Sequence, residues 1–335
     1  MPQPVEHEIS RYKLRSKHAE IDFRNYLLSL MKISLVICTR DRAGLLKTCL
    51  QSLSKSSIEF HEVIVVDQSS TIAASIPIIE ELLPVIRNLK HIPTETRGLS
   101  KARNVGIKAS TSDIIAFTDD DCIVTREWAE AIIQEFDRDK DTMAVYGKVL
   151  PAFIGDQARK MLAICLKDNR QEYKKLVNPW EFQSGNNMAL RREVFTEIGY
   201  FDELLGPGAE LRNCDDADMA YRMLRSGLKV VYTPKAVIYH RLWREDMEVL
   251  RVEKDYNIGA GALLIKHLRY GDIYVLKLIL ERLLFRGIGN IILATLTTSK
   301  HRLLKGYCYL FVTQGIWKGL MKPLSFKYRV FATPD

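Results

Sequence analysis

The chain has 335 residues, of which 47% are hydrophobic and 9% aromatic, so it can bury a substantial core and is too apolar for a disordered protein. Its formal net charge is +8, and the charge is unevenly placed. From Arg251 to the C-terminal end there are 14 Lys and Arg against 5 Asp and Glu, which leaves about −1 for the first 250 residues. Because apolar runs alternate with single cations in this basic region, it favours anionic lipid over nucleic acid as a partner.

The cysteine pattern excludes zinc ribbons and disulfide frameworks, because no CxxC pair or short metal-ligand spacing occurs. The N-terminal 20 residues are too charged for a secretory signal, and no run of about 18 uncharged apolar residues is present. We therefore expect a cytoplasmic protein without a simple membrane-spanning helix. The six cysteines are Cys38, Cys49, Cys122, Cys165, Cys214 and Cys308.

Hydrophobic periodicity predicts an α/β fold from residue 31 onwards. Residues 1–30 are predicted to form a helical extension, after which an apolar run at 33–38, helical spacing at 45–53 and a second apolar run at 62–67 predict strand, helix and strand. Such units build a parallel sheet with helices on both faces. The pattern continues in the order helix 72–88, strand 89–92, helix 99–109 and strand 114–118.

The second half of the chain is less regular, and we assign it to the acceptor side. We expect strands at 143–149 and 229–232, helices near 192–198 and 215–226, and an irregular segment up to about residue 180. The predicted domains are the extension 1–30, one catalytic domain 31–250 and a basic helical region 251–335.

Polar clusters follow three of the predicted strands, where ligands bind in open α/β sheets. They are Thr39 with Arg40, Asp67, and the run Asp119 to Asp121. Three adjacent carboxylates repel one another, so a divalent cation that also binds phosphate oxygens is a natural partner. The alternative is a solvated acidic turn before a helix that starts near Thr125.

Further polar segments each have two interpretations. Asp215, Asp216 and Asp218 open a predicted helix, where acidic residues also stabilise the positive helix end. The turn Ser184 to Met188 contains Gly185, Asn186 and Asn187 and is typical of a loop close to a ligand. Arg97, Lys101 and Arg103 place three cations around one helix start. Lys101 shares a face with Asn104, and this face would hold a diphosphate or a sugar hydroxyl, or would simply be solvated. His240 follows an apolar strand-like segment and, by itself, favours a core or surface histidine.

Taken together and in order, these segments resemble glycosyltransferase family 2, the inverting enzymes of the GT-A fold. The resemblance runs from about Ile33 to His240 through SLVICTRDR, VIVVDQSS, TRGLSKARNVGI, FTDDD, SGNNMALRREVF, GYFDELLGPGAE and CDDADMAYR. It implies a GT-A domain that moves a sugar from a nucleotide-diphosphate sugar to an acceptor hydroxyl, in cell-envelope polysaccharide or glycolipid synthesis.

The resemblance also implies roles for individual residues. The nucleotide sugar would contact Thr39, Arg40, Asp67, Arg97, Lys101, Asp119 and Asp120, with Gly185, Asn186 and Asn187 in a sugar-binding loop. FTDDD would be the DxD motif, in which Asp119 and Asp121, together with His240, bind Mn²⁺ or Mg²⁺. CDDAD would supply the general base that deprotonates the acceptor. Asp216 aligns with this base, but Asp215 replaces the usual Glu, so both carboxylates stay candidates.

The basic region from 256 to 321 has two interpretations. Its interrupted apolar stretches are too short to span a bilayer, but with the adjacent cations they would lie in an anionic membrane interface. Alternatively, they pack on the catalytic domain or on another subunit. A peripheral membrane contact would suit a lipid-linked acceptor.

Two other functions compete with the glycosyltransferase interpretation. A nucleotidyltransferase would carry a glycine-rich basic loop after the first strand, and Cys38 to Gly44 has one glycine. A non-catalytic nucleotide-sugar or carbohydrate-binding protein of the same fold would not need both acidic clusters.

Overall fold

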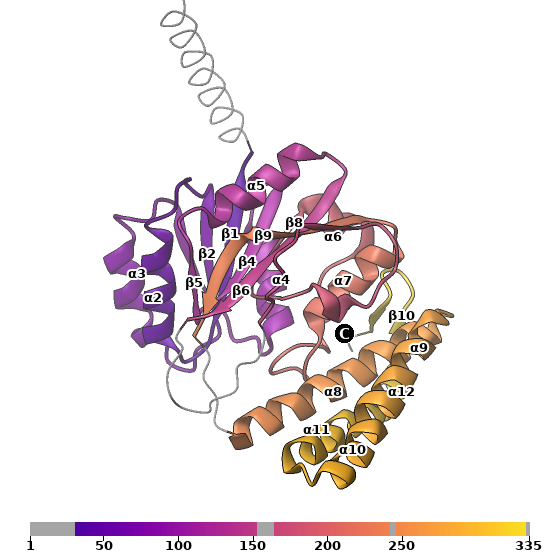
Figure 1. Ribbon diagram of the computed structural model, residues 1–335. Helices are drawn as coiled ribbons and strands as arrows, with labels where there is room; N and C mark the ends of the chain where they lie inside the picture. Colours follow the sequence, from indigo (N-terminus) through magenta and orange to yellow (C-terminus); the bar gives the residue numbers. More distant parts are fainter. Residues whose placement is uncertain (1–30, 153–163, 242–245, 333–335) are drawn as a thin grey trace, which may run out of the picture.

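The computed structural model describes residues 31–152, 164–241 and 246–332. The helical extension predicted for residues 1–30 lies outside the described residues. Within them, nine strands form one mixed sheet in the order β3-β2-β1-β4-β8-β6-β9-β5, with β7 also pairing with β9 (Figure 1). The strands are β1 Ile33–Thr39, β2 Glu62–Asp67, β3 Leu89–Pro93, β4 Ile114–Asp119, β5 Cys122–Val124, β6 Thr142–Pro151, β7 Gln171–Tyr173, β8 Met188–Arg191 and β9 Lys229–His240.

The first four strands are parallel, and their register brings the predicted polar clusters to one edge. Thr39 pairs with Asp67 across β1 and β2, and Cys38 pairs with Asp119 across β1 and β4. All six residues of β2 are buried, as expected for a parallel strand with helices on both faces. The predicted α/β fold with a C-terminal helical extension is confirmed.

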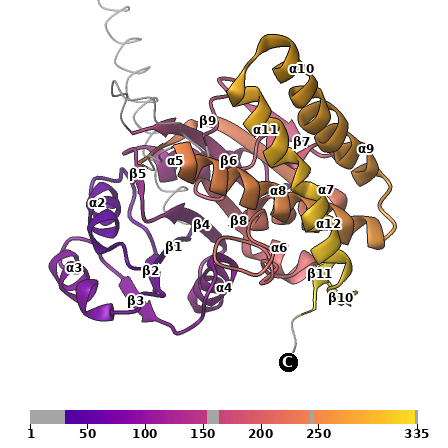
Figure 2. The ribbon, with the colours of Figure 1, turned by 90° about the horizontal axis from the view of Figure 1, so that it is seen from below.

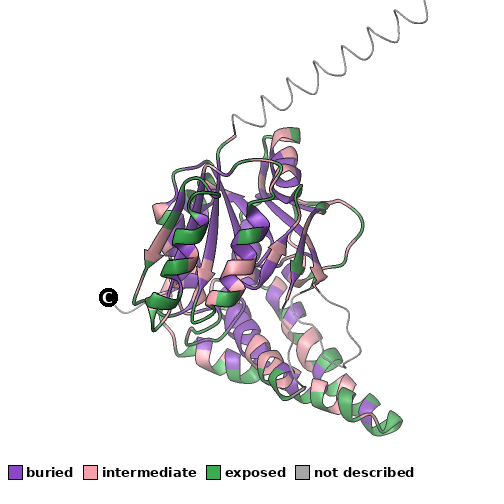
Figure 3. Cartoon of the chain, turned by 90° about the vertical axis from the view of Figure 1, so that its left-hand side faces the viewer, coloured by how far each residue is buried: buried purple, intermediate pink, exposed green. Residues whose placement is uncertain are grey.

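Two helical layers cover the sheet, because successive side chains of a strand point to opposite faces. Leu35 of β1 belongs to the core beneath α2, α3 and α5, whereas its neighbour Val36 belongs to the core beneath α4, α6 and α7. Burial along the sheet is nearly continuous (Figure 3). These helices are α2 Ala43–Leu53, α3 Ile76–Leu82, α4 Leu99–Ala109, α5 Trp128–Arg138, α6 Arg192–Ile198 and α7 Asp215–Arg225, with 3₁₀ turns η1 Ile72–Ala74 and η2 Pro179–Glu181.

Three predicted boundaries were wrong. The helix expected over 72–88 is η1 followed by α3, which ends at Leu82 because Pro84 has no N–H to continue the helical hydrogen bonds. The helix expected near Thr125 begins at Trp128, since residues 122–124 form β5, antiparallel to the end of β9. That pairing extends β9 from the predicted Tyr232 to His240.

The C-terminal helices form a bundle beside α7 (Figure 2). They are α8 Asp246–Arg269, α9 Tyr274–Leu280, the π-helical η3 Glu281–Ile288, α10 Gly289–Thr297, α11 Lys300–Leu310 and α12 Val312–Leu320, followed by the hairpin β10 Leu324–Ser325 and β11 Val330–Phe331. Glycines let α8 and α12 cross closely: a Cβ on Gly315 would lie 1.9 Å from the Ile258 carbonyl oxygen. Among the described residues, no helix has the length and apolar character needed to cross a bilayer.

A fully buried charge cluster joins α8 to α7. The Lys266 Nζ lies 2.6 Å from Asp218 Oδ1 and 2.7 Å from Asp202 Oδ2, and all three side chains are 0% exposed. His267 Nε2 also lies 3.0 Å from Asp218 Oδ1, and Arg222 Nε donates to the other oxygen, Oδ2, at 2.8 Å. Asp202 also accepts from the Phe331 amide at 2.9 Å, so one lysine links α7, α8 and β11.

We expect Lys266→Met to destabilise the protein by about 3–5 kcal/mol, because it removes the cation beside the buried Asp202 and leaves Asp218 with Arg222 alone among its permanent cations. Urea unfolding followed by circular dichroism measures this loss. Lys277→Met is the matched control, since Lys277 is exposed on α9 and its replacement is expected to change stability by less than about 0.5 kcal/mol. Equal stability of the two variants would contradict the linking role of Lys266.

Candidate active site

A cleft of about 420 Å³ opens at the carboxyl ends of β1 and β4. One wall carries Thr39 and Arg40 after β1 together with the three aspartates from Asp119 to Asp121. The facing wall comes from the 207–213 loop and the first half of α8, and His240 lines the cleft at the end of β9. The topology therefore gathers segments from both halves of the chain around one acidic cavity.

Asp120 anchors the loop after β1. The Thr39 hydroxyl donates to its carboxylate at 2.7 Å, and the Arg42 guanidinium lies 3.3 Å from its other oxygen. Burial, reinforced by the negative charge of Asp121, raises the pKa of Asp120 to about 7. These contacts join Asp120, which follows β4, to the end of β1, so the structure gives Asp120 a connecting role.

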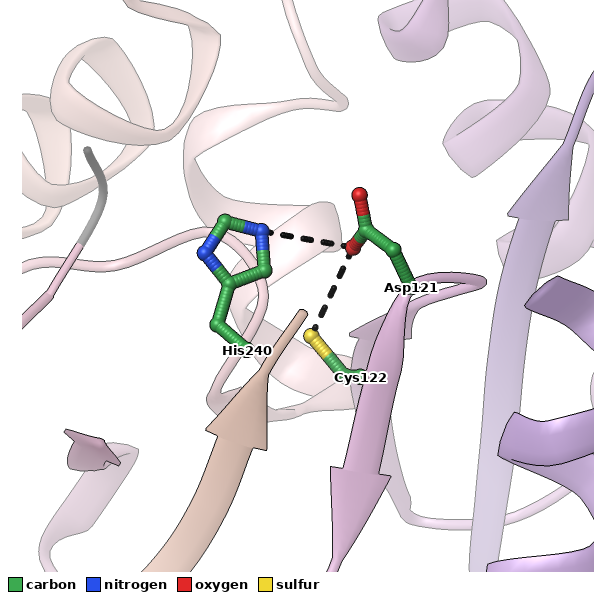
Figure 4. Close-up of side chains that lie close together, drawn as sticks. All are labelled: Asp121, Cys122 and His240. Carbon is green, nitrogen blue, oxygen red and sulfur yellow. Dashed lines mark hydrogen bonds and ion pairs between the residues drawn. The ribbon is translucent and has the colours of Figure 1, made fainter. Parts of the chain in front are cut away.

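Asp121 and His240 form a candidate metal site (Figure 4). Their Oδ1 and Nε2 atoms are 3.3 Å apart, and together with Cys122 Sγ they lie within 4.8 Å of one another. Although burial opposes it, the hydrogen bond and charge of His240 hold the pKa of Asp121 below its usual value. Cys122 belongs to the apolar core and its thiol points to Asp121 Oδ1 at 3.7 Å. A carboxylate and an imidazole fit Mn²⁺ or Mg²⁺, whereas a protonated buried thiol is a poor ligand for a hard cation.

Arg103 is the central cation of the site, and the sequence interpretation missed its role. Its side chain is 3% exposed and lies 2.5 Å from Asp215 Oδ2 and 3.4 Å from Asp119 Oδ1. It also donates to the Gly185 carbonyl at 2.9 Å. The usable signal was helical spacing, because Arg103 shares the buried face of α4 with Ala102 and Ile107.

Asp216 lies at the first turn of α7 and is held by backbone amides. Gly185 N donates to its Oδ2 at 2.9 Å and Ala217 N to its Oδ1 at 2.8 Å. Burial and the charge of Asp215 raise the pKa of Asp216 to about 6. Asp215 is 3% exposed and paired with Arg103, so the two candidate bases sit in different environments.

The predicted sugar-binding loop divides between the site and the core. Gly185 touches Arg103 and Asp216, as described above. Asn187 is fully buried, accepts from the Trp128 indole at 2.8 Å and donates to the Lys148 and Ala236 carbonyls, so it fixes β6, β8 and β9. The side-chain amide oxygen of Asn186 accepts from Ser184 at 2.6 Å.

Three other predicted nucleotide contacts lie outside the cleft lining. Asp67 is 0% exposed and accepts from the Ser69 amide, with His91 Nε2 3.0 Å from its other oxygen. Arg97 is exposed before α4, and Lys101 lies one turn further along that helix. Asn104, expected beside Lys101 at a ligand, instead donates to the Phe201 carbonyl and to Glu203.

Gly185→Ala is expected to destabilise the protein by about 1–3 kcal/mol. An added Cβ would lie 2.9 Å from both Arg103 Nη2 and Asp216 Oδ2, and both groups are fixed by their own bonds. Gly44→Ala is the control, because its Cβ meets nothing within 4 Å in α2 and the change is expected to be neutral or stabilising. Thermal unfolding compares the two, and an unaltered midpoint for Gly185→Ala would refute the close approach.

Comparisons with known proteins identify the family of this chain. The profile of Glycosyl transferase family 2 matches residues 34–199, about half of the chain. The chain is 27% identical over 227 residues to the glucosyl-dolichyl phosphate glucuronosyltransferase of Haloferax volcanii, covering 64% of this chain and 70% of that protein. It is 26% identical over 226 residues to the O-antigen chain rhamnosyltransferase of Salmonella typhimurium, covering 63% and 66% of the two chains.

Among solved structures, S. aureus TarS 1-349 in complex with UDP-GlcNAc is similar at 20% identity with a TM-score of 0.48, over 69% of this chain and 66% of that one. The chain spans just under half the length of some other curated glycosyltransferases that it matches. The family profile, the curated relatives and the acidic cleft at the strand ends together show that this chain is an enzyme of glycosyltransferase family 2.

Proposed function

We propose that the enzyme is an inverting glycosyltransferase in which Asp216 is the general base. The observation that carries this proposal is the difference between the two adjacent carboxylates of α7. Asp215 is paired with Arg103, whereas the described hydrogen bonds to Asp216 come from two backbone amides. A carboxylate with a pKa of about 6 and no paired cation among the described residues is suited to accept a proton near neutral pH.

The proposed reaction is a single displacement. The acceptor hydroxyl oxygen attacks the anomeric carbon, a new carbon–oxygen bond forms, and the bond from that carbon to the donor diphosphate breaks. The leaving nucleoside diphosphate takes the bonding electrons, and the acceptor proton moves to an oxygen of Asp216. Attack from the face opposite the leaving group inverts the anomeric configuration.

The donor is proposed to lie along the wall formed by the strand ends. Thr39 and Arg40 would flank the nucleotide, and the guanidinium of Arg42, 3.2 Å from Asp121, would stand close to the diphosphate. Asp121 and His240, with Asp119 nearby, would hold Mn²⁺ or Mg²⁺. When bound, such a cation supplies charge stabilisation to the departing diphosphate. Arg103 would keep Asp119 and Asp215 in place by its buried contacts.

We expect Asp216→Asn to lower turnover by about 10²–10⁴-fold while nucleotide binding is retained, because the amide cannot take the proton. The assay is nucleoside-diphosphate release from UDP-, GDP- and dTDP-sugars with Mn²⁺ or Mg²⁺ in the presence of membrane lipid extract. The native rate should fall about tenfold per pH unit below pH 6, since the base must be deprotonated and its pKa is about 6. The pH dependence of the residual Asp216→Asn activity should lack this limb.

Asp137→Asn is the matched control, because Asp137 lies on α5 and pairs with Lys140 rather than with a residue of the site, so its replacement should leave the rate unchanged. Turnover of Asp216→Asn at the native rate would exclude this residue as the base. If no donor is bound or consumed with either metal, a non-catalytic nucleotide-sugar or carbohydrate-binding protein becomes the better interpretation. A nucleotidyltransferase would instead release pyrophosphate from a nucleoside triphosphate.

We also propose that the C-terminal helices contact an anionic membrane. From α9 to α10 an apolar residue recurs at every fourth position, and each is 43% to 76% exposed. A repeat of four is longer than the 3.6 residues of an α-turn, and the wider π-helical turns of η3 in the middle of this segment offset part of the resulting drift. The stripe consists of Leu276, Leu280, Leu284, Ile288, Ile292 and Leu296.

The charge around this stripe complements an anionic surface. Residues 270–332 contain 10 Lys and Arg against 2 Asp and Glu. Exposed leucines beside cations are the combination that binds a lipid interface. The names of the two curated relatives include a dolichyl phosphate and an O-antigen chain, which supports a lipid-linked acceptor in glycolipid or cell-envelope polysaccharide synthesis. The cytoplasmic face of the membrane stays a prediction.

Replacement of Leu284 and Phe285 together by Glu is expected to reduce binding to anionic vesicles by about tenfold or more, because two charges would have to enter the lipid interface. Cosedimentation with vesicles containing phosphatidylglycerol measures binding, and phosphatidylcholine vesicles test the charge requirement. Val85→Glu is the control, since Val85 is 58% exposed but follows α3, far from α10 in Figure 1. Unchanged binding of the double variant, or no binding of the native protein, would refute the membrane contact.

A further inference from the structure

One face of α8 forms a wall of the catalytic cleft. Val252, Asp255 and Tyr256 are spaced i, i+3 and i+4 and all line the cleft. Gly259 follows on the same face, where a Cβ would lie 2.3 Å from the Asn213 carbonyl oxygen. Because α8 packs against this backbone just before α7, the three side chains are held in fixed positions beside the start of α7.

Tyr256 offers an unused hydrogen-bond donor at this wall. Its ring packs against the cluster that contains Cys214 and Ala217 of the α7 start, and Cys214 Sγ contacts the Tyr256 carbonyl at 3.4 Å. The phenol makes no hydrogen bond to any residue that the structure describes. Burial and the negative charge of Asp216 raise the pKa of the Tyr256 phenol well above its usual value, so it stays protonated.

Asp255 and Arg212 add a carboxylate and a guanidinium beside this ring. Arg212 Nε lies 3.8 Å from Asp255 Oδ1, and the two side chains are 52% and 34% exposed. Arg212 and Cys214 both have positive φ angles, 80° and 73°, which turn the chain sharply just before α7. A phenol, a carboxylate and a guanidinium together donate to and accept from several hydroxyl groups, the chemistry that recognises a sugar.

We propose that Tyr256, Asp255 and Arg212 form the subsite for the acceptor sugar, with Tyr256 donating to a hydroxyl next to the one that is glycosylated. This inference rests on the proposed function. The donor is assigned to the wall of strand ends, so the facing wall is free for the second substrate. Since α8 lies against the start of α7, an acceptor seated there presents a hydroxyl to Asp216.

The test separates acceptor binding from donor binding in the full-length protein. Nucleotide affinity is measured by calorimetry with UDP, GDP and dTDP, each in Mn²⁺. Acceptor affinity is measured with the nucleotide bound, by saturation-transfer NMR titration with octyl glycosides of glucose, galactose, mannose, rhamnose and N-acetylglucosamine. Tyr256→Phe removes only the hydroxyl, Tyr256→Ala removes the ring as well, and Tyr307→Phe is the control, being 52% exposed on α11.

We expect Tyr256→Phe to weaken glycoside binding by about fivefold, the effect of one lost hydrogen bond, and Tyr256→Ala by more, with nucleotide affinity within about twofold of native. Tyr307→Phe should match the native protein in both titrations. Unchanged glycoside affinity in both Tyr256 variants, an equal loss of nucleotide affinity, or no glycoside bound by the native protein overturns the subsite. Failure of the native protein to bind any of the three nucleotides would instead overturn the proposed function.

Discussion

The buried guanidinium of Arg103 is the interaction on which the arrangement of the site depends. It contacts Asp119 at the end of β4, Asp215 at the start of α7 and the carbonyl of Gly185 in the loop before β8. An unpaired charge in this position would cost several kcal/mol, so each partner is held where it satisfies the guanidinium. Gly185 must be glycine for the same reason, because the loop has to come within contact distance of Arg103 and Asp216.

The small number of paired arginines also explains why the pKa values of some carboxylates at the site are raised. Asp119, Asp120 and Asp121 line the cleft, and Asp215 and Asp216 lie behind its lining at the start of α7. Among the described residues, Arg42 and Arg103 are the two arginines that pair with members of this group. The surplus of negative charge, added to burial, raises the pKa of Asp120 to about 7 and that of Asp216 to about 6. A divalent cation would offset this surplus of negative charge, so the ionised carboxylates favour its binding.

The sequence was sufficient to predict the parallel half of the sheet, because apolar runs ending in polar residues place Thr39, Asp67 and Asp119 at one edge. The family resemblance implied that Asp121 and His240 bind one metal ion, although the pairing of β5 with β9 that brings the two residues together was not predicted. The sequence did not separate site residues from core residues in the polar loop before β8. There Asn187 is a buried connector, and its partners come from three distant segments, at Trp128, Lys148 and Ala236. Local patterns cannot contain such long-range pairings.

In the C-terminal region, too, the sequence could not distinguish packed from exposed apolar residues. It left two alternatives, packing on the protein and contact with lipid. In the structure α8 is packed on the protein, whereas α9 to α10 expose their apolar residues. On α8, Lys266 is buried against Asp218 and Gly259 rests on the Asn213 backbone, so this helix is built into the catalytic half. On α9 to α10 the stripe from Leu276 to Leu296 is exposed. The domain boundary at residue 250 stays a prediction, but Val252, Asp255 and Tyr256 of α8 line the cleft, so the helical region contributes side chains directly to the candidate active site.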